Sequence, residues 1–167
     1  AENIGLDGIW STDVDRDPFL PLAVAAMTTT KVLLGTGIAV AFARSPMTTA
    51  MAANDLHEMS GGRFVLGLGT QIQAHIERRF SMPWSAPADR MSEYVNAIRA
   101  IWHAWRTGER LDFRGDHYQH TLMTPMFTPA PHPHGDPKIV ISAVGPRMTR
   151  VAARDADGLL VHGFTTQ

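Results

Sequence analysis

The chain has 167 residues, of which 44% are hydrophobic and 19% charged, a composition typical of one globular domain that buries a hydrophobic core. Its formal net charge of −1 gives no electrostatic reason to expect nucleic acid or a membrane as a partner, and no apolar run reaches the length of a membrane span. Because there is no cysteine, disulfides and thiolate sites are excluded, which is compatible with the cytoplasmic location that we predict.

The first part of the chain is predicted to run strand, helix, strand, helix. Residues 6–11 and 31–40 are short, mostly apolar runs and predict buried strands. A helix is expected between them over residues 18–27, with a proline in its first turn. The next helix is predicted over residues 46–59, because Ser45 can cap its free N–H groups and two glycines follow its end.

A third strand is predicted at residues 64–68, which hold only apolar residues and glycine. Both faces of such a strand are buried in a parallel sheet that helices cover. Gly67 and Gly69 leave room for a flat ligand at the end of the strand, or serve tight packing alone. They also resemble the start of a dinucleotide-binding fingerprint, but Ile72 holds the place of its third glycine, which argues against that fold.

The longest helix is expected over residues 87–107, after a polar, proline-rich stretch at residues 72–86 that we predict to be a loop. Apolar residues recur in this helix at spacings of three and four, which predicts one buried face. They are Met91, Tyr94, Val95, Ile98, Ile101, Trp102 and Trp105. Without clustered positive charge, this stripe indicates core rather than a platform for nucleic-acid bases.

Residues 109–136 are rich in proline and histidine and are predicted to form an insertion or lid. His132 and His134 raise the question of a metal site, but proline-rich loops rarely fix ligands and no third ligand is suitably placed, so we predict no metal. His57 and His103 fall within predicted helices. We expect both to face solvent or helix neighbours and assign them no function.

The last part of the chain predicts two more strands, at residues 138–143 and 157–162, the second ended by Gly163. A helix starts between them near Pro146. The five strands alternate with helices, which is the pattern of a parallel α/β sheet. Five units are too few to close a (β/α)8 TIM barrel of roughly 250 residues. We therefore predict one domain that forms the barrel segment from the second to the sixth strand.

Several motifs together resemble the bacterial luciferase-like family over essentially the whole chain. They lie at residues 33–38, 44–46, 59–69, 137–143, 145–146 and 156–158. Residues 69–76 and 127–129 resemble a subgroup of F420-dependent oxidoreductases. The resemblance implies a barrel that binds FMN or the deazaflavin F420 at the C-terminal ends of its strands.

The resemblance also implies roles for individual residues. The Gly37–Ile38 link would be a cis peptide behind the cofactor ring, and Gly69, Thr70 and Gln71 would edge the ring. The phosphate would lie at the helix start formed by Ala143, Val144, Gly145, Pro146, Arg147 and Met148. Asp13 falls close to where some F420 members place an active-site histidine, which leaves the acid or base open. Ile72 stands where one F420 subgroup has an acidic residue, so the substrate cannot be carried over.

Elementary chemistry agrees with two of these assignments. A helix start offers free N–H groups and a positive dipole end to a phosphate, and Arg147 can add a charge-assisted contact or be merely solvated. His162 ends the last predicted strand on the cofactor side, where an imidazole can move a proton. The alternative for His162 is a hydrogen-bonded structural role.

The leading hypothesis is an F420-dependent oxidoreductase that transfers a hydride between the deazaflavin and a small organic substrate. An FMN-dependent monooxygenase is the alternative, and a catalytically silent flavin-binding protein is an alternative of another class. The helix at residues 46–59 carries Met47, Met51 and Met59. Together with the resemblance, this methionine content predicts at least a homodimer.

Overall fold

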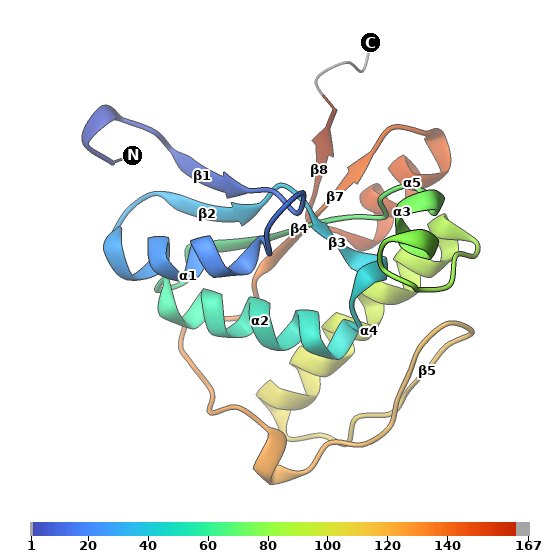
Figure 1. The fold of residues 1–167 in the computed structure, drawn as a ribbon. Coiled ribbons are helices and arrows are strands. Elements are labelled where there is room, and N and C mark those ends of the chain that lie inside the picture. Colours follow the sequence, from blue (N-terminus) through green and yellow to red (C-terminus); the bar gives the residue numbers. More distant parts are fainter. Residues whose placement is uncertain (1, 163–167) are drawn as a thin grey trace.

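The computed structural model describes residues 2–162, which form a curled parallel sheet with helices along one side (Figure 1). The sheet order is β1-β2-β4-β7-β8, and a short strand, β3, also pairs with β4. The strands are β1 (Gly8–Ser11), β2 (Leu33–Thr36), β3 (Ala39–Val40), β4 (Phe64–Gly69), β7 (Lys138–Ala143) and β8 (Gly158–Val161). All of their pairings are parallel, which confirms the predicted segment of a parallel α/β barrel.

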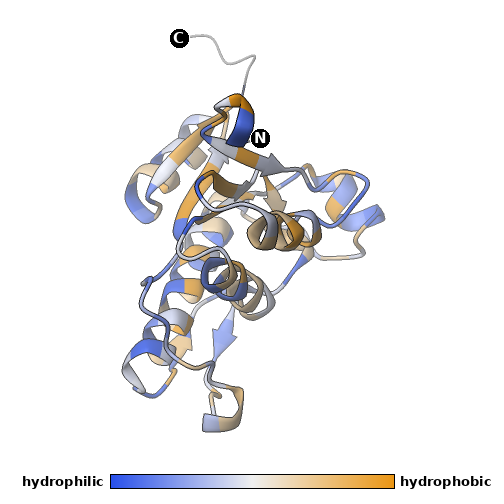
Figure 2. Cartoon of the chain, turned by 90° about the vertical axis from the view of Figure 1, so that its left-hand side faces the viewer, coloured by the Kyte–Doolittle hydropathy of each residue, from blue (hydrophilic) through white to orange (hydrophobic). Residues whose placement is uncertain are grey.

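Helices connect the strands in the order that the sequence predicts. They are α1 (Phe19–Thr28), α2 (Pro46–Met59), α3 (Gln73–Arg78), α4 (Pro87–Thr107) and α5 (Pro146–Asp155), with short 3-10 turns at Glu2–Ile4, Ala41–Ala43 and Pro125–Phe127. The side chain of Ser45 caps α2 by accepting a hydrogen bond from the backbone N–H of Thr48 at 3.1 Å. The helices differ in character: α4 combines a buried apolar stripe with polar residues, whereas α1 is apolar over nearly its whole length (hydropathy of the chain in Figure 2).

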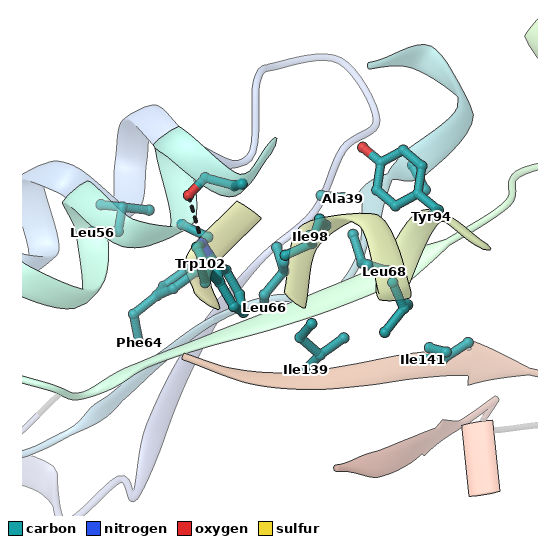
Figure 3. Packing of buried hydrophobic residues seen from close by; sticks show 14 of the residues in the cluster. Ala39, Leu56, Phe64, Leu66, Leu68, Tyr94, Ile98, Trp102, Ile139 and Ile141 are labelled. Atoms are coloured by element: carbon teal, nitrogen blue, oxygen red, sulfur yellow. Dashed lines mark hydrogen bonds between the residues drawn. The ribbon is translucent and has the colours of Figure 1, made fainter. Parts of the chain in front are cut away.

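The hydrophobic core lies between the sheet and helices α2 and α4 (Figure 3). Alternate residues of β4 and β7 point toward the helices and are fully buried or nearly so; they are Phe64, Leu66, Leu68, Ile139 and Ile141. Every member of the apolar stripe predicted for α4 is buried. Trp102 also donates a hydrogen bond from its indole to the Ala50 carbonyl oxygen at 3.1 Å, so its polar atom is satisfied. Each large side chain buried here stabilises the fold by roughly 1.5–3 kcal/mol.

The opposite face of the sheet is partly open. Trp10 is 45% exposed and Leu33 is 47% exposed, although both belong to strands. The Trp10 ring covers β2 so closely that a Cβ atom on Gly35 would lie 2.4 Å from it, so a larger residue at position 35 would displace the ring. In the described part of the chain, β1 and β8 each pair along one edge only.

Three details differ from the prediction. The strand expected at residues 31–40 is broken into β2 and β3. At the break, the Thr36 hydroxyl donates to the Gly67 carbonyl at 2.7 Å and accepts from the Gly67 N–H at 2.9 Å. Hydrogen bonds of this side chain to β4 therefore take the place of the backbone hydrogen bonds between strands. The loop expected at residues 72–86 contains α3, whose single buried residue, Ile76, gave too weak a periodic signal.

The segment at residues 109–136 also holds more structure than a plain loop. It contains an antiparallel hairpin of β5 (Phe113–Arg114) and β6 (Gln119–His120), which lies away from the parallel sheet (Figure 1). The carboxylate of Glu93 on α4 accepts hydrogen bonds from the backbone N–H groups of residues 116–118, which fastens the hairpin to the helix. The last strand agrees with its prediction except for Gly163, which lies outside the described residues.

Candidate active site

The parallel strands bring the predicted site residues to one edge of the sheet, at their C-terminal ends. Asp13 follows β1, the Gly37–Ile38 link follows β2, and Gly69 ends β4. Residues 143–148 join β7 to α5, and His162 follows β8. This is the edge at which α/β barrels place their ligands and chemistry.

The backbone of residues 37–40 lies at the centre of this edge, and we call this segment the ridge. The Gly37–Ile38 peptide is cis, as the resemblance implies. The Gly37 N–H donates to the Ser11 carbonyl at 2.7 Å, which ties the ridge to the end of β1. On the other side, Ile38 packs against Gly69, where a Cβ atom would come within 2.7 Å of the Ile38 side chain. The ridge is therefore held between its two neighbouring strands.

Asp13 is buried beside the ridge, and its carboxylate is engaged in internal bonds. One oxygen, Oδ2, accepts from Arg44 Nη1 at 2.5 Å and from the Val40 N–H at 2.9 Å. Arg44 also pairs with Asp17 at 3.0 Å. Burial would lower the pKa of Arg44, but the hydrogen bonds and charges of Asp13 and Asp17 outweigh burial and raise it. The acid or base role predicted for Asp13 is untested, and this geometry favours a structural role.

The residues after β4 form a tight turn. Gln71 has a positive φ of 60°, and its side-chain Oε1 accepts from the Ile72 N–H at 3.0 Å. The Thr70 hydroxyl donates to the Gln71 carbonyl at 2.9 Å. These local bonds fix the direction in which the chain leaves the sheet, next to Gly69 and the ridge. The predicted contact of these residues with a cofactor ring stays a prediction.

The start of α5 opens onto a hollow of about 920 Å³. Gly145 is the N-cap of the helix, and a Cβ atom on it would meet nothing within 4 Å. Arg147 and Arg150 line the hollow, and the guanidinium group of neither forms a hydrogen bond or ion pair within residues 2–162, whereas that of Arg154 pairs with Asp155 at 2.9 Å. The arrangement offers helix N–H groups and two available guanidinium groups to an anion.

His162 lies at the same edge, directly after β8, and is exposed. Its predicted role in proton transfer is not tested by this position alone. His103, for which no function was expected, is exposed on α4 and pairs with Glu109 at 3.1 Å, in agreement with the prediction.

The expectation for His57 is wrong, because the residue is buried rather than solvent-facing. Its ring lies between the carbonyl oxygens of Phe64 at 3.2 Å and His134 at 3.4 Å. Its centroid is 5.9 Å from that of His132, whose Nε2 lies 3.1 Å from Asn54 Oδ1. Burial lowers the pKa of His57 and outweighs the hydrogen bonds to the two carbonyl oxygens, which raise it; the neighbouring imidazoles lower it further. Helical spacing was the missed signal, since Asn54 and His57 continue the buried stripe of α2.

The described residues contain no group of three or more His, Asp or Glu side chains with the arrangement of a metal site. Between residues 2 and 162, no helix combines the length and the apolar character that crossing a bilayer requires. The fold defines part of a (β/α) barrel, and this edge is the one at which such barrels bind their ligands.

Comparison with known proteins identifies the family. The luciferase-like monooxygenase family matches residues 1–167, so the chain belongs to that family. An uncharacterized protein of Mycobacterium tuberculosis (strain ATCC 25618 / H37Rv) is 55% identical over 99% of this chain and 49% of its own length. A 5,10-methylenetetrahydromethanopterin reductase of Methanolobus tindarius is 34% identical over 97% of this chain and 47% of its own.

Solved structures show the same fold. The coenzyme F420-dependent tetrahydromethanopterin reductase from Methanopyrus kandleri matches with a TM-score of 0.77 and 24% identity, over 96% of this chain and 49% of that one. The oxygenating constituent of 3,6-diketocamphane monooxygenase from the CAM plasmid of Pseudomonas putida, in complex with FMN, matches with a TM-score of 0.75 and 17% identity, over 95% and 48%. The chain thus spans about half the length of these proteins, and related proteins use F420 or FMN.

Proposed function

We propose that this chain supplies the cofactor-binding part of an F420-dependent oxidoreductase that transfers a hydride between the deazaflavin and a small organic substrate. The proposal rests on one observation. The ridge at residues 37–40, with the apolar side chain of Ile38, and the open N-terminus of α5 lie at the same edge of the sheet. A ring system needs a flat apolar support, and a phosphate needs free N–H groups. The 34% identical reductase of Methanolobus tindarius adds support for F420 chemistry.

The residues fit a phosphate-bearing ring cofactor in two respects. Gly145 leaves open space in front of the N–H groups of α5, and Arg147 stands beside it without an ion-pair partner in the described part of the chain. Gly37, Ile38 and Gly69 would support the ring, with Thr70 and Gln71 along its edge. When bound, the cofactor supplies the hydride chemistry, and the protein supplies orientation and a dry pocket. His162 would hold or release a proton at its imidazole next to the substrate.

FMN is the alternative cofactor, because it also carries a phosphate and a flat ring. The match to a monooxygenase in complex with FMN concerns the fold and leaves the cofactor of this protein open. A catalytically silent flavin-binding protein would use the same edge without turnover. The location that we propose is the cytoplasm, where the protein would act on a small molecule.

The full-length protein is proposed to be a homodimer. A groove of about 490 Å³ lies between α2 and residues 122–129 and is mostly apolar. Met51 is 52% exposed, Met126 87% and Phe127 73%. Such a continuous apolar patch is unusual on a monomer and is suited to a second copy of the protein.

The cofactor is tested by titrating the full-length protein with F420 and with FMN, followed by fluorescence and absorbance. We expect tight F420 binding, weaker FMN binding and hydride transfer with F420. Tight binding of FMN alone, with oxygen consumption, would support the monooxygenase instead. Binding without turnover across substrate classes would support the silent protein.

A further inference from the structure

We propose that Asp13 is a positioning residue that, together with Arg44, fixes the ridge at residues 37–40. In the proposed function, on which this part of the inference rests, the ridge supports the cofactor ring. Asp13 thereby sets where the ring lies, instead of exchanging a proton with the substrate.

Two hydrogen bonds join Asp13 to the ridge. Its backbone N–H donates to the Ile38 carbonyl at 3.2 Å, and its carboxylate accepts from the Val40 N–H at 2.9 Å. The backbone of Asp13 thus bonds the ridge at Ile38, and its side chain bonds the ridge at Val40. Val40 is fully buried, so water cannot replace the carboxylate as acceptor for its N–H.

Arg44 lies between Asp13, the ridge and Asp17. Its Nη1 donates to Asp13 Oδ2 at 2.5 Å and to the Val40 carbonyl at 3.3 Å, while its Nη2 donates to Asp17 Oδ2 at 3.0 Å. The guanidinium also lies 5.5 Å from the centroid of the Phe19 ring. One planar, permanently charged group therefore joins the ridge to the loop that follows β1.

The Asp13 carboxylate is enclosed by the protein. Only 5% of its side chain is exposed, and the oxygen that faces the ridge already accepts two hydrogen bonds. A buried carboxylate bonded in this way is well suited to hold a backbone segment in place.

The ridge is confined on its other side by the contact between Ile38 and Gly69. The pairing of β3 with β4 holds it on the same side, and the Asp13–Arg44 pair holds it on the side of the loop at residues 12–17. Displacement of a positioned reactant by about 1 Å can cost about a hundredfold in rate. Loss of the pair should consequently weaken cofactor binding and turnover together.

The test uses two variants of similar size, Asp13→Asn and Arg44→Lys, in the full-length protein. Asp15→Asn is the matched control, because Asp15 lies in the same loop with 80% of its side chain exposed. We measure amide hydrogen exchange at Val40 without cofactor, the affinity for F420, and the pH profile of turnover at saturating cofactor. Asp13→Asn and Arg44→Lys should speed Val40 exchange and weaken F420 binding by about tenfold each. Both should keep the wild-type shape of the pH profile, and the control should change nothing.

The inference is overturned if Asp13→Asn leaves Val40 exchange and F420 affinity unchanged but removes one limb of the pH profile, which would identify Asp13 as the acid or base. Failure of the proposed function is a separate result, namely a wild-type protein that binds neither F420 nor FMN. In that case faster Val40 exchange in both variants still supports the conclusion that Asp13 and Arg44 hold the ridge in place. Unchanged exchange overturns that conclusion.

Discussion

The side chain of Ile38 fills the space that a side chain on Gly69 would need, since a Cβ atom there would lie 2.7 Å from Ile38 Cγ1 and 2.8 Å from Cδ1. Gly69→Ala should therefore push the ridge away from β4. We expect a loss of about 1–3 kcal/mol in the free energy of unfolding, as for other overpacked sites, measured by chemical denaturation.

Gly145→Ala is the matched control for this change. Gly145 has a φ of −95°, and a Cβ atom on it would meet nothing within 4 Å. Its stability should fall by only about 0.5 kcal/mol, because alanine meets no other atom there and is merely a poorer N-cap residue than glycine. Equal losses in both variants would contradict the contact between Ile38 and Gly69.

A second prediction concerns the pH dependence of stability through His57. Burial lowers the pKa of His57 in the folded protein, so folding favours the neutral ring. The stability contributed by the neutral ring is fully present above the unfolded pKa of about 6.5 and is lost as the pH falls through this value toward the lower folded pKa. His57→Gln should be less stable than wild type at pH 8 but should lose less stability between pH 7 and pH 5.

Urea denaturation at several pH values measures this effect. His103→Gln is the control, because His103 has the same chemistry on an exposed part of α4. The control should follow the wild-type pH dependence. If His57→Gln shows the full wild-type loss between pH 7 and pH 5, protonation of His57 does not destabilise the fold.

The sequence was sufficient to predict the order of strands and helices because their signals are local. The stripe predicted for α4 is confirmed, and the predicted burial of residues 64–68 holds except at Val65, which is only partly buried. The break between β2 and β3 could not be predicted from composition, because it depends on the Thr36 hydroxyl reaching Gly67 in another strand. Only the resemblance pointed to the unusual peptide at Gly37.

The sequence allowed us to predict which edge of the sheet holds the candidate site. It did not allow us to predict the individual side-chain contacts there. The C-terminal ends of parallel strands must meet, so Asp13, Gly69 and Gly145 could be assigned to one edge in advance. The pairing of Asp13 with Arg44 could not, since the two residues are 31 positions apart and joined only by the tertiary fold. The same holds for the contact of His57 with the segment at residues 132–134.

A third prediction addresses assembly. If the apolar groove binds a second copy, Met51→Lys combined with Met126→Lys should convert the full-length dimer to a monomer, because two charges would be buried at the interface. Light scattering at micromolar concentration measures the mass. Val24→Lys, at a 65% exposed position on α1, is the control and should stay dimeric. A wild-type protein that is monomeric under these conditions would rule out the dimer.

The last prediction tests the proposed phosphate site at the start of α5. A valine at position 145 would not crowd the turn itself, because a Cβ atom there meets no protein atom within 4 Å. Gly145 also has the extended conformation that valine favours, with φ −95° and ψ 155°. Gly145→Val should therefore fold normally, as circular dichroism would verify. Any loss of cofactor affinity then reports a contact between the new side chain and the bound phosphate.

We expect Gly145→Val to weaken cofactor binding by at least tenfold, since the branched side chain would stand in front of the helix N–H groups. Arg147→Ala should cost about 1–3 kcal/mol of binding free energy if the guanidinium bonds the phosphate, and almost nothing if it is solvated. Gln71→Ala, next to the ring, should change turnover or the ring spectrum more than affinity. Titration of the three full-length variants separates these contributions. Wild-type affinity in a folded Gly145→Val protein would exclude the start of α5 as the phosphate site, because no cofactor could approach those N–H groups past valine without a penalty.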